Sequence, residues 1–360
     1  MDRAKAMASL SLRRERTLRL EVSSCKMPLP LLACSILAAW LRTMQGVSPI
    51  PPQDEVGLGP ISTRNGRVVD LPFLRFSPRA DLLPKGQTSV ETSIQVINDV
   101  RRDPEDLNLP AVLFEDQETQ RLSFLFSQGV GGGLEASVEV PFLARDGGFM
   151  DPIINWWHHT ILPDVYRVRD YLPFGQCVVT IPGVGTFASA EGIGDVSGFL
   201  RKRLSGNFIA AVAIKAPIGN PGGLLGSGAF DGGLDLEYRT KLMRKLQLDA
   251  SAGVVAQGKP TVLKNARGLV DQEFLGLTYL RDSRDAWIAQ WQAESSPTNI
   301  GLASNDGPHR MLTFGYERKL SEKERLDLYF SEDHDLVPGN PLLVNIAPDF
   351  TIGIRVVRRF

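Results

Sequence analysis

The C-terminus of the chain reads as a strand with two different faces. Residues 348–360 are PDFTIGIRVVRRF, in which apolar and polar side chains alternate up to a final aromatic residue. A strand has a side-chain period of two, so the apolar face collects Phe350, Ile352, Ile354 and Val356. Soluble enzymes seldom end in this way. The closing strand of a transmembrane β-barrel does, because it must pair with the first strand to remove the free sheet edges.

The composition agrees with such a barrel. A mean hydropathy of -0.08 and 22% charged residues exclude a helical membrane protein, whereas a barrel shows only every second residue to lipid. The 34 glycines and 24 prolines suit many strands joined by many turns. A formal net charge of -1 gives no reason to expect nucleic acid as a partner.

The first 48 residues predict an export signal. A basic stretch up to Lys26 precedes about fifteen apolar residues, 27–41, which is the length of a signal-peptide core and too short for a transmembrane helix. Small residues near Gly46 offer a cleavage region, and translation from Met27 is an alternative start. A lipoprotein signal ending at Cys34 fits less well, because most of the apolar stretch follows that residue.

The mature chain divides into two parts. Residues 49–85 are rich in proline and predict an extended N-terminal arm that lies in the periplasm or plugs the barrel. In residues 86–360, apolar and polar side chains alternate as they do in strands, which predicts an all-β, antiparallel transmembrane barrel of about twelve strands. Short connections such as 204–206 alternate with long ones such as 144–190, as expected for periplasmic turns and external loops. A further hairpin within 176–190 is an open alternative.

The polar faces of these strands carry many charges. Charged side chains on a lipid-facing surface cost several kcal/mol each, so we assign them to the lumen. They line a solute path, or they cross-link a closed interior. The predicted inward set is Glu91, Glu135, Glu139, Asp195, Asp235, Glu237, Asp249, Glu317, Asp327, Arg201, Arg203, Lys215, Arg239, Arg310, Arg325, Arg355 and Arg359.

The predicted external loop 144–175 contains the sequence NWWHH. Its residues Asp151 to Thr160 predict a short helix. One hypothesis folds the loop into the barrel mouth as a constriction made by Trp156, Trp157, His158 and His159. The alternative is an amphipathic helix packed on the rim. Two adjacent histidines rarely complete a metal site, so we expect neither a metal nor another cofactor.

The sequence offers no catalytic constellation. A hydrolase would need a serine or aspartate nucleophile beside a histidine base. The chain has four histidines and lacks the Gly-x-Ser-x-Gly elbow. The glycine-rich stretches lack the Gly-Lys-Ser/Thr of a phosphate loop. We expect the protein not to be an enzyme, with an outer-membrane hydrolase as the least favoured alternative.

Several motifs resemble one bacterial family. They are LPFLRFSP (71–78), LPKGQ (83–87), VEVPFLARDGGFMD (138–151), GIGDVSGFLRKRL (192–204), AIKAPIGN (213–220) and LLGSGAFD (224–231). Together they resemble the DUF3187 proteins, uncharacterised outer-membrane barrels, over roughly residues 59–360. The GIGD strand followed by AIKAP is also similar to transporter barrels of the phenol meta-degradation pathway. The resemblance implies the barrel fold and favours a small apolar or aromatic solute.

These observations together predict a barrel in the outer membrane of a Gram-negative bacterium. Its expected function is passive passage of a small solute, and a non-conducting structural or surface-interaction barrel is the alternative. Expected partners are outer-membrane lipids and the barrel-assembly machinery. The signal read by that machinery would comprise Phe350, Ile352, Ile354, Val356 and Phe360, although Arg358 replaces the apolar residue usual near the end.

Overall fold

The computed structural model describes residues 57–79, 81–161, 168–332 and 346–360, all within one compact unit, Ser48–Phe360. The predicted leader, 1–48, and the first part of the arm, 49–56, lie outside the described residues. The helical elements that are described are α2 (Asp151–Thr160), α3 (Ala303–Asp306), η1 (Val168–Tyr171) and η2 (Pro221–Gly223). None of the described helices is long and apolar enough to cross a membrane.

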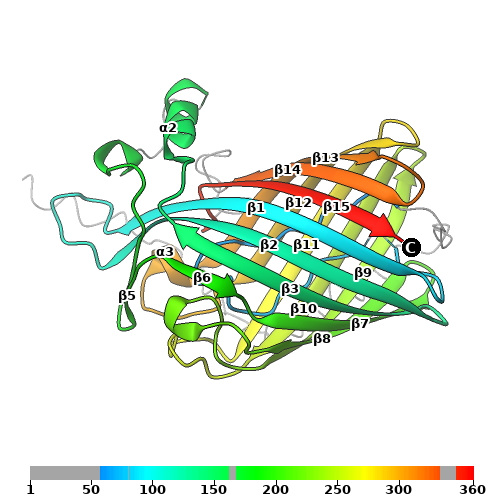
Figure 1. Ribbon diagram of the computed structural model, residues 1–360, viewed down its shortest axis with the longest axis horizontal. Helices are drawn as coiled ribbons and strands as arrows, with labels where there is room; N and C mark the ends of the chain where they lie inside the picture. The colour runs from blue at the N-terminus through cyan, green and yellow to red at the C-terminus, as the bar shows by residue number, and fades with distance from the viewer. Residues whose placement is uncertain (1–56, 80, 162–167, 333–345) are drawn as a thin grey trace, which may run out of the picture. The chain divides into compact units, whose positions relative to one another are not determined.

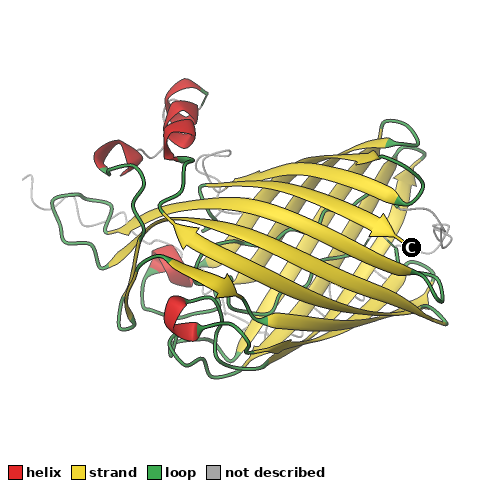
Figure 2. Cartoon of the chain, in the orientation of Figure 1, coloured by secondary structure: helices red, strands yellow, loops and turns green. Residues whose placement is uncertain are grey.

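Antiparallel strands of the described chain form a closed barrel (Figures 1 and 2). The twelve wall strands are β1 (Thr88–Asp103), β2 (Leu113–Gly131), β3 (Leu134–Asp146), β7 (Val196–Ser205), β8 (Phe208–Ala216), β9 (Asp231–Met243), β10 (Leu246–Gln257), β11 (Leu269–Leu280), β12 (Asp285–Ser295), β13 (Pro308–Lys319), β14 (Glu324–Glu332) and β15 (Phe350–Arg359). Each strand pairs with the next, and β15 pairs with β1 from Asn98–Phe350 to Ser89–Arg359. The predicted fold class and strand number are therefore confirmed.

Three short strands lie outside this wall. β4 (Val178–Ile181) and β5 (Gly185–Phe187) form a hairpin whose first strand pairs with the start of β2. β6 (Ala190–Ile193) pairs with the end of β3. The possible hairpin in 176–190 therefore exists, but it extends the long-loop end and adds no strand to the barrel (Figure 1).

Short turns and long loops gather at opposite ends, as the sequence predicts (Figure 2). The turn between β2 and β3 is Gly132–Gly133, with φ of 59° and 72°. Positive φ at both central residues matches the right-handed twist of the strands that such a hairpin joins, and glycine adopts it without steric cost. Phe360 lies at this turn end, where its backbone N–H donates to the Thr88 carbonyl at 2.9 Å.

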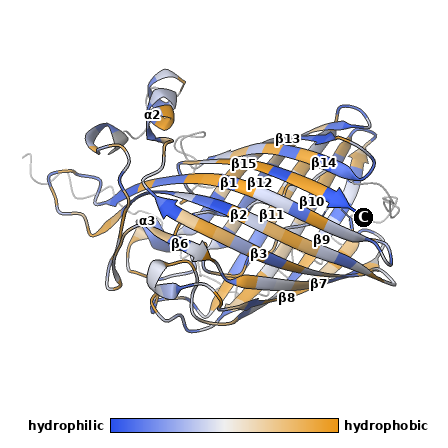
Figure 3. Cartoon of the chain, in the orientation of Figure 1, coloured by the Kyte–Doolittle hydropathy of each residue, from blue (hydrophilic) through white to orange (hydrophobic). Residues whose placement is uncertain are grey.

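The distribution of apolar and polar side chains in the wall is the reverse of that in a soluble protein. Outward side chains are exposed and apolar, including Ile352 and Ile354 of β15, and apolar bands cover the outside of the barrel (Figure 3). Inward side chains of the same strand, such as Thr351, Arg355 and Arg359, are polar and buried. The predicted faces of the terminal strand are confirmed. An apolar outside around a polar inside is the arrangement of a transmembrane barrel.

Candidate functional site: the filled barrel lumen

The predicted lumen charges point into the barrel and are withdrawn from solvent. Eleven members of the predicted inward set were expected to line a solute path: the nine named in the next sentence, which are buried, and Glu139 and Arg239, which are half-buried. The buried nine are Glu135, Asp195, Arg201, Asp235, Glu237, Asp249, Arg325, Asp327 and Arg355. One member of the larger inward set is wrong. Arg310 shares the outward face of β13 with Leu312 and Phe314, at the long-loop end.

The N-terminal arm occupies the lumen and crosses it twice. Gly57 lies at the turn end, where its carbonyl accepts a hydrogen bond from Arg325. The arm reaches the long-loop end near Arg67, whose guanidinium binds Glu115. It then returns to the turn end at Leu83, whose N–H donates to Glu135 at 2.9 Å. Residues 57–79 are almost all buried.

Three glutamines of the wall hold the arm backbone. The Gln290 Oε1 accepts from the Ile61 N–H at 2.6 Å, and its Nε2 donates to the Ile61 carbonyl at 3.0 Å. Gln272 likewise binds the N–H of Phe76 and the carbonyl of Leu74, at 2.9 and 3.0 Å. Gln292 donates to the carbonyl of Thr63 at 3.1 Å. An amide can satisfy a backbone donor and acceptor together, so these side chains replace the pairing that a neighbouring strand would supply.

The charged wall residues bind the arm as well. Carboxylates accept its backbone N–H groups: Asp231 from Leu74 at 3.1 Å and Glu237 from Arg79 at 3.0 Å. Guanidiniums donate to its carbonyls, as Arg355 does to Pro60 at 3.1 Å. Glu237 and Arg355 were predicted as lumen residues and Asp231 was not, and all three bind the backbone of the arm.

Ion pairs complete the interior. Within the wall, Arg355 binds Asp327 at 2.5 Å and Arg239 binds Asp249 at 2.7 Å. Between arm and wall, Arg67 binds Glu115 at 2.7 Å with both side chains fully buried. Buried charges of this kind are tolerated because they are paired.

Little space remains between arm and wall. One cavity near β1, β2 and β3 has a volume of about 50 Å³, and a second, beside β9 to β13, has about 30 Å³. A larger hollow of about 250 Å³ lies at the turn end, beside Gly57 and Lys319. The two inner cavities have room for a few waters each, on the order of one water per 10–15 Å³ of such volume. With the arm in place, these cavities admit no organic solute.

The family motifs meet at a buried lysine near the long-loop end. The Lys215 Nζ binds Asp195 at 2.6 Å, Asp231 at 3.2 Å, and the Ser227 hydroxyl at 2.6 Å. Asp195 also accepts the backbone N–H of Gly219 and of Ser227, both at 2.9 Å. This network holds the loop between β8 and β9 against the strands. The Lys215 Nζ donates to the Ser227 hydroxyl, so it is not placed to take the proton of that hydroxyl.

The loop helix was predicted correctly, but its position as a constriction is wrong. α2 spans Asp151–Thr160 as expected. Met150, the residue before the helix, and Ile154 pack with Phe350, which belongs to the outward face of β15. The Trp157 ring lies 5.9 Å from the Phe350 ring, and its indole N–H donates to Glu332 at 3.1 Å. The helix stands on the outer rim (Figure 1) because apolar side chains there cover its apolar face.

The other residues of the predicted constriction differ in their exposure and contacts. Trp156 is exposed, His158 is buried, and the His159 Nε2 lies 2.8 Å from Asp170. The structure thus supports the alternative that the helix packs on the rim.

One cluster in the described chain has metal-ligating side chains: Asp70, Glu294 and His309. It does not fit a metal ion. The His309 Nδ1 lies 3.0 Å from Asp70, and its Nε2 lies 2.9 Å from the Asn305 carbonyl. Arg75 forms ion pairs with both carboxylates and already supplies the positive charge.

The geometry defines a class of protein: a closed, twelve-stranded barrel of the outer-membrane type whose lumen is filled by its own arm. The family described as "Protein of unknown function (DUF3187)" matches residues 107–360. The chain therefore belongs to the DUF3187 family, as its motifs indicated.

Solved structures agree with the fold. The chain is similar to the COG4313 outer membrane channel from Pseudomonas putida F1, with a TM-score of 0.52 and 14% identity over 79% of this chain and 100% of that one. It is more distantly similar to the Ralstonia pickettii toluene transporter TbuX, with a TM-score of 0.36 and 9% identity over 77% and 89%. The first similarity shows the fold alone, and the second is too low to carry an argument. No curated protein sequence matches the chain.

Proposed function

We propose that this protein is a channel of the bacterial outer membrane that passes a small solute when the arm, residues 57–84, is displaced. The observation that carries the proposal is that the barrel wall does not depend on the arm for its backbone pairing. All twelve strands pair in a closed ring, so the backbone hydrogen bonds of the barrel do not require the arm. A polar, charged inner surface is the lining that a water-filled passage needs.

The size of the displaced segment indicates the size of the passage. Two crossings of extended chain fill the lumen, and neighbouring extended chains occupy about 5 Å in one direction and about 10 Å in the other. Withdrawal of both crossings would open a passage roughly 10 Å wide. Such a passage admits a single aromatic ring or a small polar molecule. Small aromatics, the class implied by the family resemblance, are the first solutes to test, together with small polar solutes suited to the charged wall.

The proposed location has its own test. We propose that residues 1–48 direct export and that the assembly machinery inserts the barrel into the outer membrane. Membrane fractionation should place the protein in the outer-membrane fraction. Sequencing of the mature N-terminus should give a start near Ser48. An unprocessed protein in the inner membrane or cytoplasm would contradict this proposal.

Conductance tests the channel directly. In a planar bilayer, the full mature chain should be closed or open only briefly, whereas a chain lacking residues 57–84 should conduct steadily. Heat-modified gel mobility would establish that both proteins are folded. A milder variant, Gln272→Ala with Gln290→Ala, should increase the open time. Gln120→Ala is the matched control, because Gln120 faces outward on β2 opposite Val96.

A non-conducting structural barrel is the second candidate, and the inner cavities of about 50 and 30 Å³ favour it. The same recordings decide between the two. Folded protein that remains silent after deletion of residues 57–84 would establish the structural barrel and reject the channel.

A further inference from the structure

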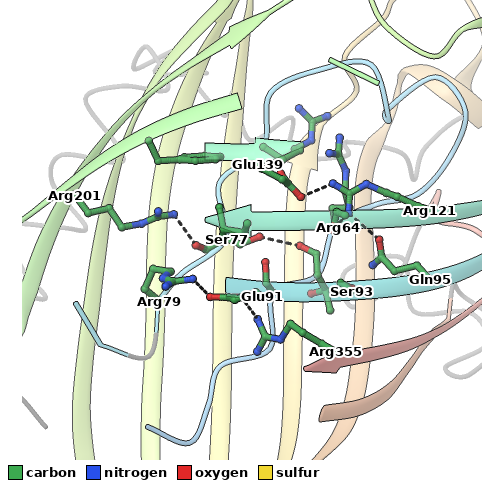
Figure 4. A pocket seen from close by; sticks show the side chains of 16 residues that line it. Arg64, Ser77, Arg79, Glu91, Ser93, Gln95, Arg121, Glu139, Arg201 and Arg355 are labelled. Atoms are coloured by element: carbon green, nitrogen blue, oxygen red, sulfur yellow. Dashed lines mark hydrogen bonds and ion pairs between the residues drawn. The ribbon is translucent and has the colours of Figure 1, made fainter. Parts of the chain in front are cut away.

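An arginine-rich cavity lies in the middle of the lumen, between the arm and strands β1, β2 and β3 (Figure 4). Its volume is about 50 Å³, enough for roughly three or four waters. Its lining contains two carboxylates, those of Glu91 and Glu139. It also contains six guanidiniums, those of Arg64, Arg75, Arg79, Arg121, Arg201 and Arg355.

Five of these arginines have a carboxylate partner of their own. The pairs are Arg75–Glu294, Arg79–Glu91, Arg121–Glu139, Arg201–Glu237 and Arg355–Asp327. Each of these five guanidiniums therefore has a carboxylate of the wall as its counter-ion.

Arg64 differs from the other five. It forms no ion pair with any residue that the structure describes. Its Nη2 donates to the carbonyls of Leu71 and Phe73, at 3.0 and 3.1 Å, which fixes the guanidinium at the cavity. Its Nε is buried without a hydrogen-bond partner in the described part of the chain. A guanidinium is protonated in proteins, so Arg64 brings to the cavity a positive charge that no described carboxylate contacts as an ion pair, although Glu139 and Glu294 attract it from further away.

The neighbouring groups increase the need for an anion. Arg121 lines the same cavity, and its Nη2 binds Glu139 (Figure 4). Glu139 also attracts Arg64 electrostatically, so one carboxylate that already has an ion-pair partner acts on two guanidiniums. The Ser123 hydroxyl accepts from Arg121 at 3.0 Å, which leaves its own proton free to donate. An unpaired buried charge costs several kcal/mol, whereas an anion between two guanidiniums gains charge-assisted hydrogen bonds.

We propose that this cavity binds a small inorganic anion of the halide class, held by Arg64 of the arm and by Arg121 of β2. The volume admits one halide ion with one or two waters, and an organic carboxylate does not fit while the arm is in place. The anion ties the arm to the wall, so halide stabilises the filled barrel. This inference goes beyond the proposed function and holds whether or not the barrel conducts.

Bromide is the probe for the site. Crystals of the full mature chain in sodium bromide should show an anomalous peak in contact with the Arg64 guanidinium. In detergent, the unfolding temperature should be higher in sodium chloride or bromide than in sodium gluconate at equal ionic strength. It should rise with the logarithm of halide concentration, because the ion binds the folded state alone.

Three variants separate the site from general salt effects. Arg64→Gln should lose the halide dependence, and Arg64→Lys, which keeps the charge, should retain part of it. Arg281→Gln removes an exposed arginine at the turn end and should respond to halide as the wild type does. If the arm of Arg64→Gln is too unstable to measure, the bromide and gluconate comparison on the wild type still decides.

Two results would overturn the proposal. One is an equal unfolding temperature of the wild type in halide and in gluconate. The other is a bromide peak at Arg64 in crystals without any halide dependence in solution, which would mean an adventitious ion only.

Discussion

Gln290 binds the backbone of Ile61 through both atoms of its amide, the Oε1 accepting at 2.6 Å and the Nε2 donating at 3.0 Å. Gln290 belongs to β12 of the wall and Ile61 to the arm, so one neutral side chain joins two segments 229 positions apart. Gln272 repeats the arrangement on the returning crossing. The arm is therefore docked by side chains and can detach without disrupting the strand ladder.

Truncating this amide should loosen the arm. Gln290→Ala leaves a buried N–H and a buried carbonyl of Ile61 without their partner, at a cost of roughly 1–3 kcal/mol for each group. Hydrogen exchange of the amides in 57–65 should become faster, while exchange in the strands stays unchanged. Gln120→Ala should leave both regions as in the wild type. Unchanged exchange in the arm of the Gln290 variant would contradict docking by this side chain.

The wall contains a close contact that restricts residue size. Gly353 of β15 lies opposite Tyr329 of β14, and a Cβ at position 353 would overlap the Tyr329 ring. Gly353→Ala should therefore reduce the yield of folded barrel or its unfolding temperature, and Gly353→Ala with Tyr329→Ser should restore part of the loss. Overpacking of this kind costs roughly 1–3 kcal/mol. Gly198→Ala is the control, because a Cβ there would make only an ordinary contact, 3.9 Å from Ile214.

The buried lysine of the loop network allows a third test. Lys215→Met would leave Asp195 and Asp231 facing each other without their shared cation. Removing one partner of a buried ion pair costs roughly 3–5 kcal/mol. We expect faster proteolysis in the loop 217–230 and a lower unfolding temperature. Lys241→Met, at an exposed lysine of β9, should change neither, and similar behaviour of the two variants would reject the network as the anchor of this loop.

An aspartate outside the barrel wall predicts a pH dependence. The Asp306 carboxylate accepts from the N–H groups of Ile300 and Gly301 at 2.8 and 2.7 Å. Partial burial acts to raise the pKa of Asp306, but hydrogen bonds from Asn305, Ile300 and Gly301 outweigh it and lower the pKa below the ordinary 3.8. A lowered pKa stabilises the folded loop above the ordinary value, and this contribution is lost as the pH falls through the lowered one.

The loop 296–307 should therefore keep its amide protection down to the ordinary pKa and lose it only at more acidic pH. Hydrogen exchange at Ile300 and Gly301 measures this directly. In Asp306→Asn the protection should be weaker and should no longer depend on pH in this range. A loss of protection that begins well above pH 3.8 would show that another group controls the loop.

The sequence predicts the strands of the barrel wall better than the contacts that the arm makes inside the barrel. Alternation fixes which side of a strand each residue occupies, so the faces of β15 and the inward charges were predicted from period two alone. Arg310 was assigned against this rule: it lies seven positions before Glu317 on β13, so period two puts the two side chains on opposite faces, and Glu317 is the one that is buried inside. The contacts of the arm are different. Gln272 and Gln290 look like any inward polar residue, and their role depends on backbone groups about 200 positions earlier. The helix α2 is amphipathic, but the spacing of its apolar residues does not show whether its apolar face packs in the barrel mouth or on the outer rim.

The last residue offers a way to separate barrel closure from recognition in the cell. The backbone of Phe360 pairs with Thr88 in both directions, at 2.9 and 3.4 Å, while the residue as a whole is 56% exposed. Phe360→Ala keeps the backbone bonds, so the refolded protein should match the wild type in unfolding temperature. Its yield in the outer membrane of cells should fall if the assembly machinery reads the ring. Deleting Phe360 removes the backbone pair as well and should lower both quantities. A normal cellular yield of Phe360→Ala would mean that the exposed ring is not part of the assembly signal, and the signal would then reside in the apolar face of β15.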